Sequence, residues 1–309
     1  MHLIDLHCDT LYKSVTENIS FTDKSLECQL MDINSSSHKL QFYAIWIPDD
    51  LTGDAAEELF YKAHKRLLSE CKKNSIALLR VKDSISESLE FNQNLAFFAI
   101  ENGLALNGKL ENVKKFAELG VRMITLTWNA HNDIGDGAEV SNAKGITEFG
   151  KKVVTEMEKN GIIVDVSHAS DKLFYDVADI TTKPIVASHS NSRTITKHPR
   201  NLTDDQFNII CRRGGIVGIN FHSAFLNNDC DKACMDDILR HTDHFLSLGG
   251  ENVLAIGSDF DGCVLPKNIK GSSSIYDIFE MFLKKGYKEE LIQKIFFKNA
   301  LNFVENFDI

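Results

Sequence analysis

Eight short apolar segments recur along the 309 residues, and stretches with the hydrophobic period of a helix separate them. Each apolar segment has four to eight residues and is almost continuously hydrophobic, which is typical of parallel strands covered on both faces. The predicted strands span residues 2–6, 40–47, 95–100, 121–126, 162–166, 184–187, 215–221 and 253–257. The predicted helices span residues 55–71, 110–119, 146–160, 170–178, 203–211 and 238–248.

Strands that alternate with helices in this way favour an α/β fold of the (β/α)8 TIM-barrel type. A doubly wound open sheet has the same local pattern and is the alternative, and residues 76–81 fit a ninth strand. Ser170 and Thr203 suit helix N-caps, and the spacing from Thr203 to Gln206 resembles a capping box. Because no fixed-period repeat or linker is visible, we expect one domain over residues 1–309.

The charge balance excludes some classes of partner. With 34 basic and 44 acidic residues the net charge is −10, so a general nucleic-acid-binding surface is not expected. No apolar run reaches the roughly 20 residues that span a bilayer, and no signal-peptide pattern begins the chain. The seven cysteines form no Cys-x-x-Cys pair and are expected to be reduced thiols. We therefore expect a cytoplasmic protein that binds neither nucleic acid nor a membrane.

Residue types that bind metals follow five of the eight predicted strands. They are His7 with Asp9, Glu101, His168, His189 and Asp259. Any one of them is more simply explained as a turn or a cap, but the carboxyl ends of barrel strands meet on one face. Side chains alternate along a strand, so His7 and Asp9 should point the same way and Cys8 the opposite way.

The ligand types predict a hydrolytic metal centre. Imidazole and carboxylate ligands without sulfur suit zinc, with His7 and Asp9 on one ion and His168 and His189 on another. Glu101 lies on a strand between these two groups and could bridge them. Two zinc ions, two carboxylates and a bridging hydroxide would leave a charge of about +1, which can activate water and hold a tetrahedral intermediate. This chemistry is the hydrolysis of an amide or an ester.

Several motifs together resemble the membrane (renal) dipeptidase family. They are Ile4–Thr10, Ala99–Gly103, Asp165–His168, Ser188–Ser190, Pro199–Asp205, Gly214–Phe221, His241–His244 and Gly257–Gly262. The resemblance extends from residue 4 to about residue 303, and the chain looks like the shorter, cytoplasmic, microbial-type members. It implies a distorted, amidohydrolase-like (β/α)8 barrel with two zinc ions per chain. It also implies cleavage of dipeptides, L-Xaa-L-Xaa or L-Xaa-D-Xaa, by the bridging hydroxide, and the family often forms homodimers.

The same resemblance implies a role for each motif residue. The metal ligands are His7 and Asp9 on the first zinc, Glu101 as the bridge, and His168 and His189 on the second. Asp259 would be catalytic together with Glu101, because it matches the aspartate that orients the attacking water and passes a proton to the leaving amine. Asp259 could also contact the amine end of the substrate. Arg200 matches an arginine that binds the carboxylate of the substrate, a task that suits a guanidinium fork.

The chain departs from the animal members at two positions. Trp128 stands where those members have a histidine that helps to hold the reacting carbonyl, and an indole cannot exchange protons at neutral pH. His131, three residues further on, could reach in instead. His222 stands where those members have a tyrosine. We expect Trp128, His131 and His222 to contact the substrate.

Two other functions remain open at this stage. Deaminases, lactonases and phosphoesterases use the same barrel, but they typically begin with His-x-His, whereas this chain has His7-x-Asp9. A metal-binding homologue that has lost its activity is the third hypothesis, and only Trp128 favours it. The variant Glu101→Ala would separate an enzyme, which loses turnover, from a scaffold, which keeps its partner.

Overall fold

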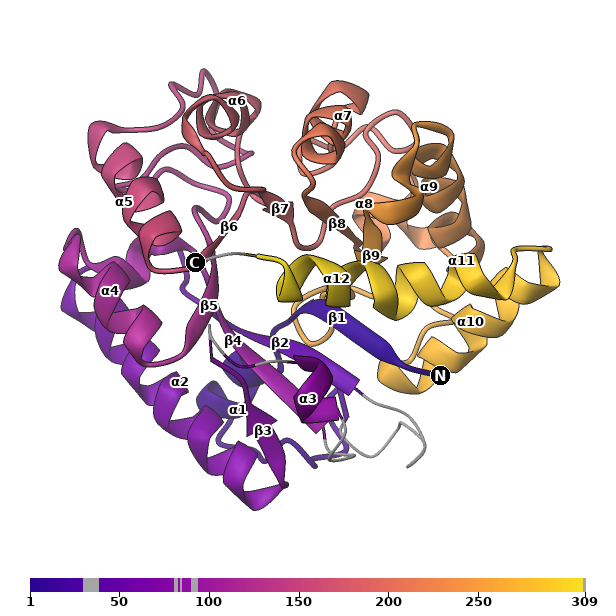
Figure 1. Cartoon of the computed structure of the whole chain (residues 1–309), viewed down its shortest axis with the longest axis horizontal. Helices are drawn as coiled ribbons and strands as arrows, with labels where there is room; N and C mark the ends of the chain where they lie inside the picture. Colours follow the sequence, from indigo (N-terminus) through magenta and orange to yellow (C-terminus); the bar gives the residue numbers. More distant parts are fainter. Residues whose placement is uncertain (30–38, 81–82, 84, 90–93, 308–309) are drawn as a thin grey trace.

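A parallel sheet that closes on itself forms the centre of the structure, a computed structural model (Figure 1). The structure describes residues 1–29, 39–80, 83, 85–89 and 94–307. Around the ring the strands follow the order β2, β1, β9, β8, β7, β6, β5, β4. Their bounds are β1 (Leu3–Cys8), β2 (Lys39–Trp46), β4 (Asn94–Glu101), β5 (Val121–Thr125), β6 (Ile163–Asp165), β7 (Val186–Ala187), β8 (Ile216–Ile219) and β9 (Leu254–Ile256).

The pairing of β2 with β4 closes the ring. It runs without interruption from Leu40 opposite Leu95 to Trp46 opposite Glu101. A doubly wound sheet would leave these two strands unpaired, so the closure confirms the predicted barrel and excludes the open sheet. The ninth strand, β3 (Ile76–Leu78), pairs with the first residues of β4, Asn94–Ala96, before β5 takes over that edge of β4. Residue 81, at the end of that predicted strand, lies outside the described residues.

Helices surround the ring of strands (Figure 1). Six of them match the predicted helices: α2 (Asp54–Lys73), α4 (Glu111–Glu118), α5 (Glu148–Lys159), α6 (Asp171–Ile180), α7 (Asp204–Arg212) and α9 (Met235–Ser247). The others are α1 (Thr10–Thr16), α3 (Ile85–Leu89), α8 (Ser223–Leu226), α10 (Ile275–Lys284), α11 (Glu289–Gln293) and α12 (Asn299–Glu305). Ser170 caps α6 and Thr203 caps α7 with a complete capping box, as predicted. No helix in the described ranges combines the length and the hydrophobicity that crossing a membrane requires.

The barrel interior is filled by apolar side chains from all eight strands, for example Phe42 on β2 and Phe97 on β4. Val304 of α12 joins this cluster, and Figure 1 shows α12 lying across the centre of the ring. The interior is therefore a packed core that α12 closes at the amino ends of the strands. The opposite rim, at the carboxyl ends of the strands, is where barrel enzymes place their sites.

Candidate active site

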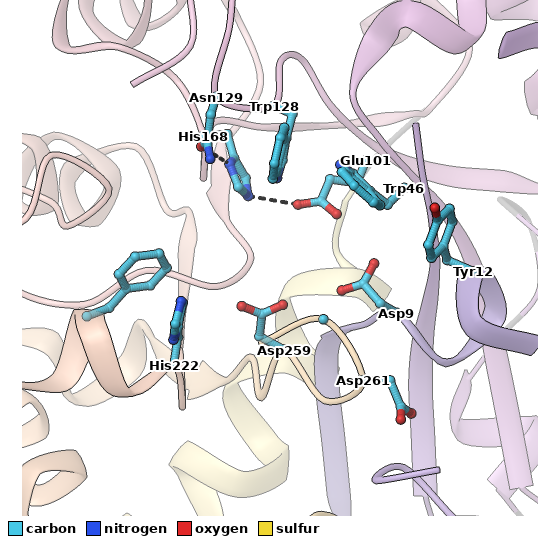
Figure 2. A pocket seen from close by; sticks show the side chains of 12 residues that line it. Asp9, Tyr12, Trp46, Glu101, Trp128, Asn129, His168, His222, Asp259 and Asp261 are labelled. Atoms are coloured by element: carbon cyan, nitrogen blue, oxygen red, sulfur yellow. Dashed lines mark hydrogen bonds and ion pairs between the residues drawn. The ribbon is translucent and has the colours of Figure 1, made fainter. Parts of the chain in front are cut away.

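A cavity of about 240 Å³ opens at the carboxyl ends of the strands (Figure 2). Its lining comes from chain segments that are far apart in the sequence: Asp9, Tyr12, Trp46, Glu101, Trp128, Asn129, His168, His222, Phe225, Asp259, Asp261 and Gly262. His7 and His189 lie beneath it and are almost fully buried. The barrel thus brings the six residues expected to bind metal or act in catalysis to one place.

Glu101, the last residue of β4, stands between two groups of ligands. Its Oε1 lies 2.7 Å from Nε2 of His168 and 3.6 Å from Nε2 of His189. Its Oε2 lies 3.7 Å from Nε2 of His7. One carboxylate oxygen therefore faces the two histidines that follow β6 and β7, and the other faces β1. Glu101 therefore contacts both groups at once.

His7 and Asp9 point into the same space, as their spacing predicts. Nε2 of His7 lies 3.3 Å from Oδ2 of Asp9. A break in register between Asp5 and Cys8 turns the end of β1, so that Cys8 packs in the outer core while His7 reaches the rim. Both ring nitrogens of His7 and Oδ1 of Asp9 are buried and have no hydrogen-bond partner within the described residues. Such orphaned polar atoms are costly unless a bound ion satisfies them.

The second pair of histidines is held by hydrogen bonds on the side away from the cavity. Nδ1 of His168 lies 2.9 Å from Oδ1 of Asn129, and Nδ1 of His189 lies 2.7 Å from the hydroxyl of Ser188. The two Nε2 atoms lie 2.9 Å apart. Because Oδ1 of Asn129 accepts a hydrogen bond from Nδ1–H of His168, Nε2 of that ring carries a lone pair that can bind a cation.

The electrostatics of the cavity also call for positive charge. Burial, with the charge of Asp9, raises the pKa of Glu101 well above its usual value. Burial raises the pKa of Asp259 to about 7. At His7 burial opposes a charge, but the carboxylates of Glu101 and Asp9 outweigh it and raise the pKa to about 10. The raised pKa values of Glu101 and Asp259 show that positive charge in this buried space would favour their ionised forms, and divalent metal ions supply such charge.

Two groups of side chains have ligand atoms close enough together to hold a metal ion. One consists of His7, Glu101 and His189, and the other of His7, Asp9 and Asp259. Both include His7, and together they contain both nitrogen and oxygen ligands. The site therefore fits metal binding through His and carboxylate ligands, without sulfur.

Asp259 is held in an unusual backbone conformation beside these ligands. Its φ is +64°, in the left-handed region, and its N–H donates to the carbonyl of His7 at 3.1 Å. Oδ2 accepts a hydrogen bond from Nδ2 of Asn220 at 2.9 Å. The next part of this turn requires glycine at position 262, because a Cβ there would lie 1.9 Å from Oδ2 of Asp9. The turn after β9 therefore locks Asp259 against the end of β1.

Arg200 lies in the loop between β7 and α7, deeply buried and without a counter-ion. None of its three guanidinium nitrogens has a hydrogen-bond partner within the described residues. Its Cζ lies 5.3 Å from the centre of the Phe225 ring, and burial lowers its pKa to about 10. A buried guanidinium in this state is a ready site for an anion such as a carboxylate.

The other three expected substrate contacts are placed differently. Trp128 and His222 line the cavity. The structure does not bring His131 there: its side chain is 64% exposed, and its Nδ1 lies 2.7 Å from Oδ1 of Asp136. The turn that pairs His131 with Asp136 directs the imidazole to the surface.

Sequence reasoning missed several residues of this site. Tyr12, Trp46, Asn129 and Phe225 line the cavity, and Ser188 orients His189. Trp46 lies one residue before the end of the predicted strand 40–47, so its closeness to the rim was a usable signal. Tyr12 and Phe225 have no such signal, because aromatic residues in helices are ordinarily part of the core.

The family model for membrane dipeptidases, peptidase family M19, matches residues 1–308. The chain belongs to the membrane dipeptidase family. A curated relative, an uncharacterized protein in the pqqA 5′ region of Klebsiella pneumoniae, is 33% identical over 216 residues, 67% of this chain and 80% of that protein. Two solved metallo peptidase structures superpose on nearly the whole chain.

The crystal structure of dipeptidase AC, a metallo peptidase of family M19, is 25% identical with a TM-score of 0.91 over 99% of this chain and 98% of its own. A metallo peptidase from Rhodobacter sphaeroides, liganded with a phosphinate mimic of L-Ala-D-Ala, is 24% identical with a TM-score of 0.90 over 100% of this chain and 99% of its own. The membership confirms the resemblance and the amidohydrolase-like barrel. This member of the family is a metallo-dipeptidase, and its buried His and carboxylate groups suit a metal.

Proposed function

We propose that the protein hydrolyses the peptide bond of dipeptides with two zinc ions at this centre. The observation that carries the proposal is the central position of Glu101, with one carboxylate oxygen toward His168 and His189 and the other toward His7. His7 and Asp9 would hold one ion, His168 and His189 the other, and Glu101 both. Zinc ions bound there would bring the pKa of a water molecule close to neutral and polarise the peptide carbonyl.

The chain's own groups supply the remaining steps. Asp259, with a pKa raised to about 7, can accept a proton from the attacking water and pass it to the leaving amine. Its hydrogen bond from Asn220 keeps the carboxylate pointed at the cavity. Arg200 would bind the terminal carboxylate of the substrate and so set the position of the peptide bond. Trp128 and His222 would contact the substrate from opposite walls.

The dimensions of the site favour dipeptides over longer peptides. A cavity of about 240 Å³ is small beside the roughly 300–1,000 Å³ of typical ligand pockets. The buried Arg200 requires a free carboxylate close to the scissile bond. We propose L-Xaa-L-Xaa and L-Xaa-D-Xaa dipeptides as substrates, because the expected family tolerance concerns the second residue.

The test measures the release of free amino acids from a panel of L-L and L-D dipeptides. It uses zinc-loaded protein and chelator-stripped protein, with metal content measured for each. We expect zinc-dependent cleavage of dipeptides, two zinc ions per chain, and no cleavage of tripeptides or N-blocked dipeptides. No cleavage by protein that holds two zinc ions would contradict the proposal and implicate Trp128.

The variant Glu101→Ala separates the proposal from the inactive-homologue hypothesis. We expect it to lose at least about 10²- to 10³-fold in kcat, the loss that follows removal of one strong transition-state contact. Lactone and phosphoester substrates, tested alongside, address the alternative of another metal-dependent hydrolase. Preferential cleavage of either class would favour that alternative.

Two features of the cellular form are further proposals. We propose a cytoplasmic location, on the likeness to the shorter, microbial-type members of the family, and a homodimer, on the habit of the family. Cell fractionation and light scattering of the purified protein test them separately. Recovery in the membrane fraction, or a mass of one chain in solution, would contradict them.

A further inference from the structure

Three aromatic side chains form a continuous wall on one side of the cavity. They are Tyr12 of α1, Trp46 at the end of β2 and Trp128 after β5, and we call them the aromatic wall. The ring centres of Tyr12 and Trp46 lie 4.9 Å apart, as do those of Trp46 and Trp128. All three line the cavity and are partly exposed to it. Figure 2 shows Tyr12 and Trp46 across the cavity from His222, with Asp9 and Asp259 between them.

The aromatic wall is tied to the metal-binding carboxylates by the backbone. Trp46 stands directly opposite Glu101 in the pairing of β2 with β4. Tyr12 follows Asp9 by three residues, within the first turn of α1. A substrate group that reacts between Glu101 and Asp9 therefore lies next to this wall, however the rest of the substrate is oriented.

The opposite end of the cavity identifies which part of a dipeptide meets the wall. Phe225 lines that end, and the guanidinium of Arg200 lies 5.3 Å from its ring. If Arg200 binds the terminal carboxylate, the carboxyl-terminal residue occupies the end with Phe225 and His222. The amino-terminal residue then extends toward Tyr12, Trp46 and Trp128.

We propose that the aromatic wall binds the side chain of the amino-terminal residue and selects large apolar side chains. This inference rests on the proposed dipeptidase function. Flat aromatic faces gain from contact with apolar and aromatic groups, and the three wall side chains carry no charge to offset the desolvation of an ionic one. Glycine would leave the wall exposed, and aspartate would be disfavoured at it.

The first measurement compares kcat/KM for the series Xaa-Ala, with glycine, leucine, phenylalanine, aspartate and lysine as Xaa. We expect leucine and phenylalanine to exceed glycine by at least about tenfold, the range that pocket contacts of this size provide. Trp46→Ala should remove most of this preference, measured as the ratio of kcat/KM for Phe-Ala to that for Gly-Ala. Trp46→Phe, which is expected to preserve the fold, should keep a preference for apolar side chains. Equal rates across the series, or the highest rate with lysine, would overturn the inference.

The second measurement does not depend on turnover. The chain contains two tryptophans, and both stand in the aromatic wall, so tryptophan fluorescence reports on the wall alone. Uncleavable phosphinate analogues of Phe-Ala and Gly-Ala serve as probes with the zinc-loaded protein. We expect a saturable change in emission, with a Kd at least tenfold lower for the Phe analogue. Equal Kd values, or binding without a change in emission, would overturn the inference even if dipeptides are cleaved.

The outcomes distinguish the inference from the function on which it rests. Cleavage of dipeptides without regard to the amino-terminal side chain would leave the proposed function intact and remove the role of the wall. Failure to cleave any dipeptide would contradict the proposed function directly. In that case the fluorescence titration still decides whether the wall prefers an apolar group.

Discussion

The hydroxyl of Ser188 lies 2.7 Å from Nδ1 of His189 and, on its other side, 2.6 Å from Oδ2 of Asp165. Asp165 is fully buried and also accepts hydrogen bonds from Thr125 and Ser167. An ionised carboxylate only accepts, so Ser188 donates to Asp165 and accepts from Nδ1 of His189. The arrangement fixes the tautomer of His189 and leaves Nε2 unprotonated toward the cavity.

Ser188→Ala is therefore expected to weaken metal binding about 10- to 100-fold, as the loss of an outer hydrogen-bond partner typically does. The measurement is metal affinity by competition with a chromogenic chelator, together with the melting temperature of the metal-free protein. Ser190→Ala is the matched control, because the Ser190 hydroxyl is also buried on this loop but has no partner among the described residues. Equal metal affinity in the two variants would contradict the role of Ser188.

Arg200→Met should separate binding from stability. Loss of a charge-assisted contact worth about 1.5–3 kcal/mol predicts a KM for dipeptides raised by about 10- to 100-fold. The substrate-free protein should become no less stable, since the variant removes a buried and unpaired charge. Kinetics and thermal unfolding test the two parts. Dipeptide amides serve as the control substrate, because they lack the carboxylate and should be affected little.

Gly262→Ala is expected to disable the site without unfolding the barrel. The added Cβ would lie 1.9 Å from Oδ2 of Asp9 and 3.0 Å from Oδ1 of Asp259, so one of the two carboxylates must move. We expect a loss of at least about tenfold in kcat/KM and weaker metal binding, with a far-UV circular dichroism spectrum like that of the parent. Gly214→Ala adds a Cβ that meets no neighbouring atom but strains a left-handed backbone (φ +69°), so it is the control for a loss of stability without a clash. Full activity in Gly262→Ala would show that Asp9 tolerates displacement.

The burial of His241 predicts that the free energy of unfolding falls in acid. Its ring is fully buried on α9, its Nδ1 accepts from the N–H of Ser192 at 3.0 Å, and its Nε2 donates to the carbonyl of Leu226 at 3.0 Å. Burial lowers its pKa to about 4 from an ordinary value of 6.5. Between these two pH values the unfolded chain binds a proton that the folded protein excludes. The free energy of unfolding should therefore fall as the pH drops from about 6.5 to 4, by up to about 3 kcal/mol.

Urea unfolding of the parent protein at several pH values between 7 and 5 measures this slope. His241→Gln, which can keep one donor and one acceptor, should show a smaller slope. His2→Gln changes an exposed histidine and should leave the slope unchanged. If all three proteins lose stability equally in acid, His241 is not the group responsible.

The metal-binding part of the site could be predicted from the sequence because its residues are polar and interrupt apolar segments. His7, Glu101 and His168 stand out in this way, and the barrel then brings their strand ends together. Of the wall residues, Trp128 was predicted as a substrate contact, but Tyr12 and Trp46 were not, because Trp46 continues an apolar segment and Tyr12 lies in a helix. Whether these side chains contact a substrate depends on where the pocket lies in the folded protein, which the sequence pattern does not show.

The burial of Arg200 was equally invisible, since its loop has no periodicity to indicate depth, and only the family resemblance pointed to it. His131 shows the opposite case, a residue that was expected in the site but lies at the surface. It lies close to Trp128 in sequence, but a short turn directs it to the surface. Helix α12, which closes the barrel, was also not predicted, because the sequence after the last predicted strand carries no strand to mark its boundaries.

The contact between Asp259 and His7 joins chain segments 252 residues apart, since the N–H of one donates to the carbonyl of the other. During synthesis the first ligand leaves the ribosome long before the turn that completes its surroundings. Contacts of such sequence separation form late in folding. A nascent chain can therefore display His7 and Asp9 but cannot yet hold the complete centre. A metal centre built on these residues would therefore be completed only after the turn that carries Asp259 has been synthesised.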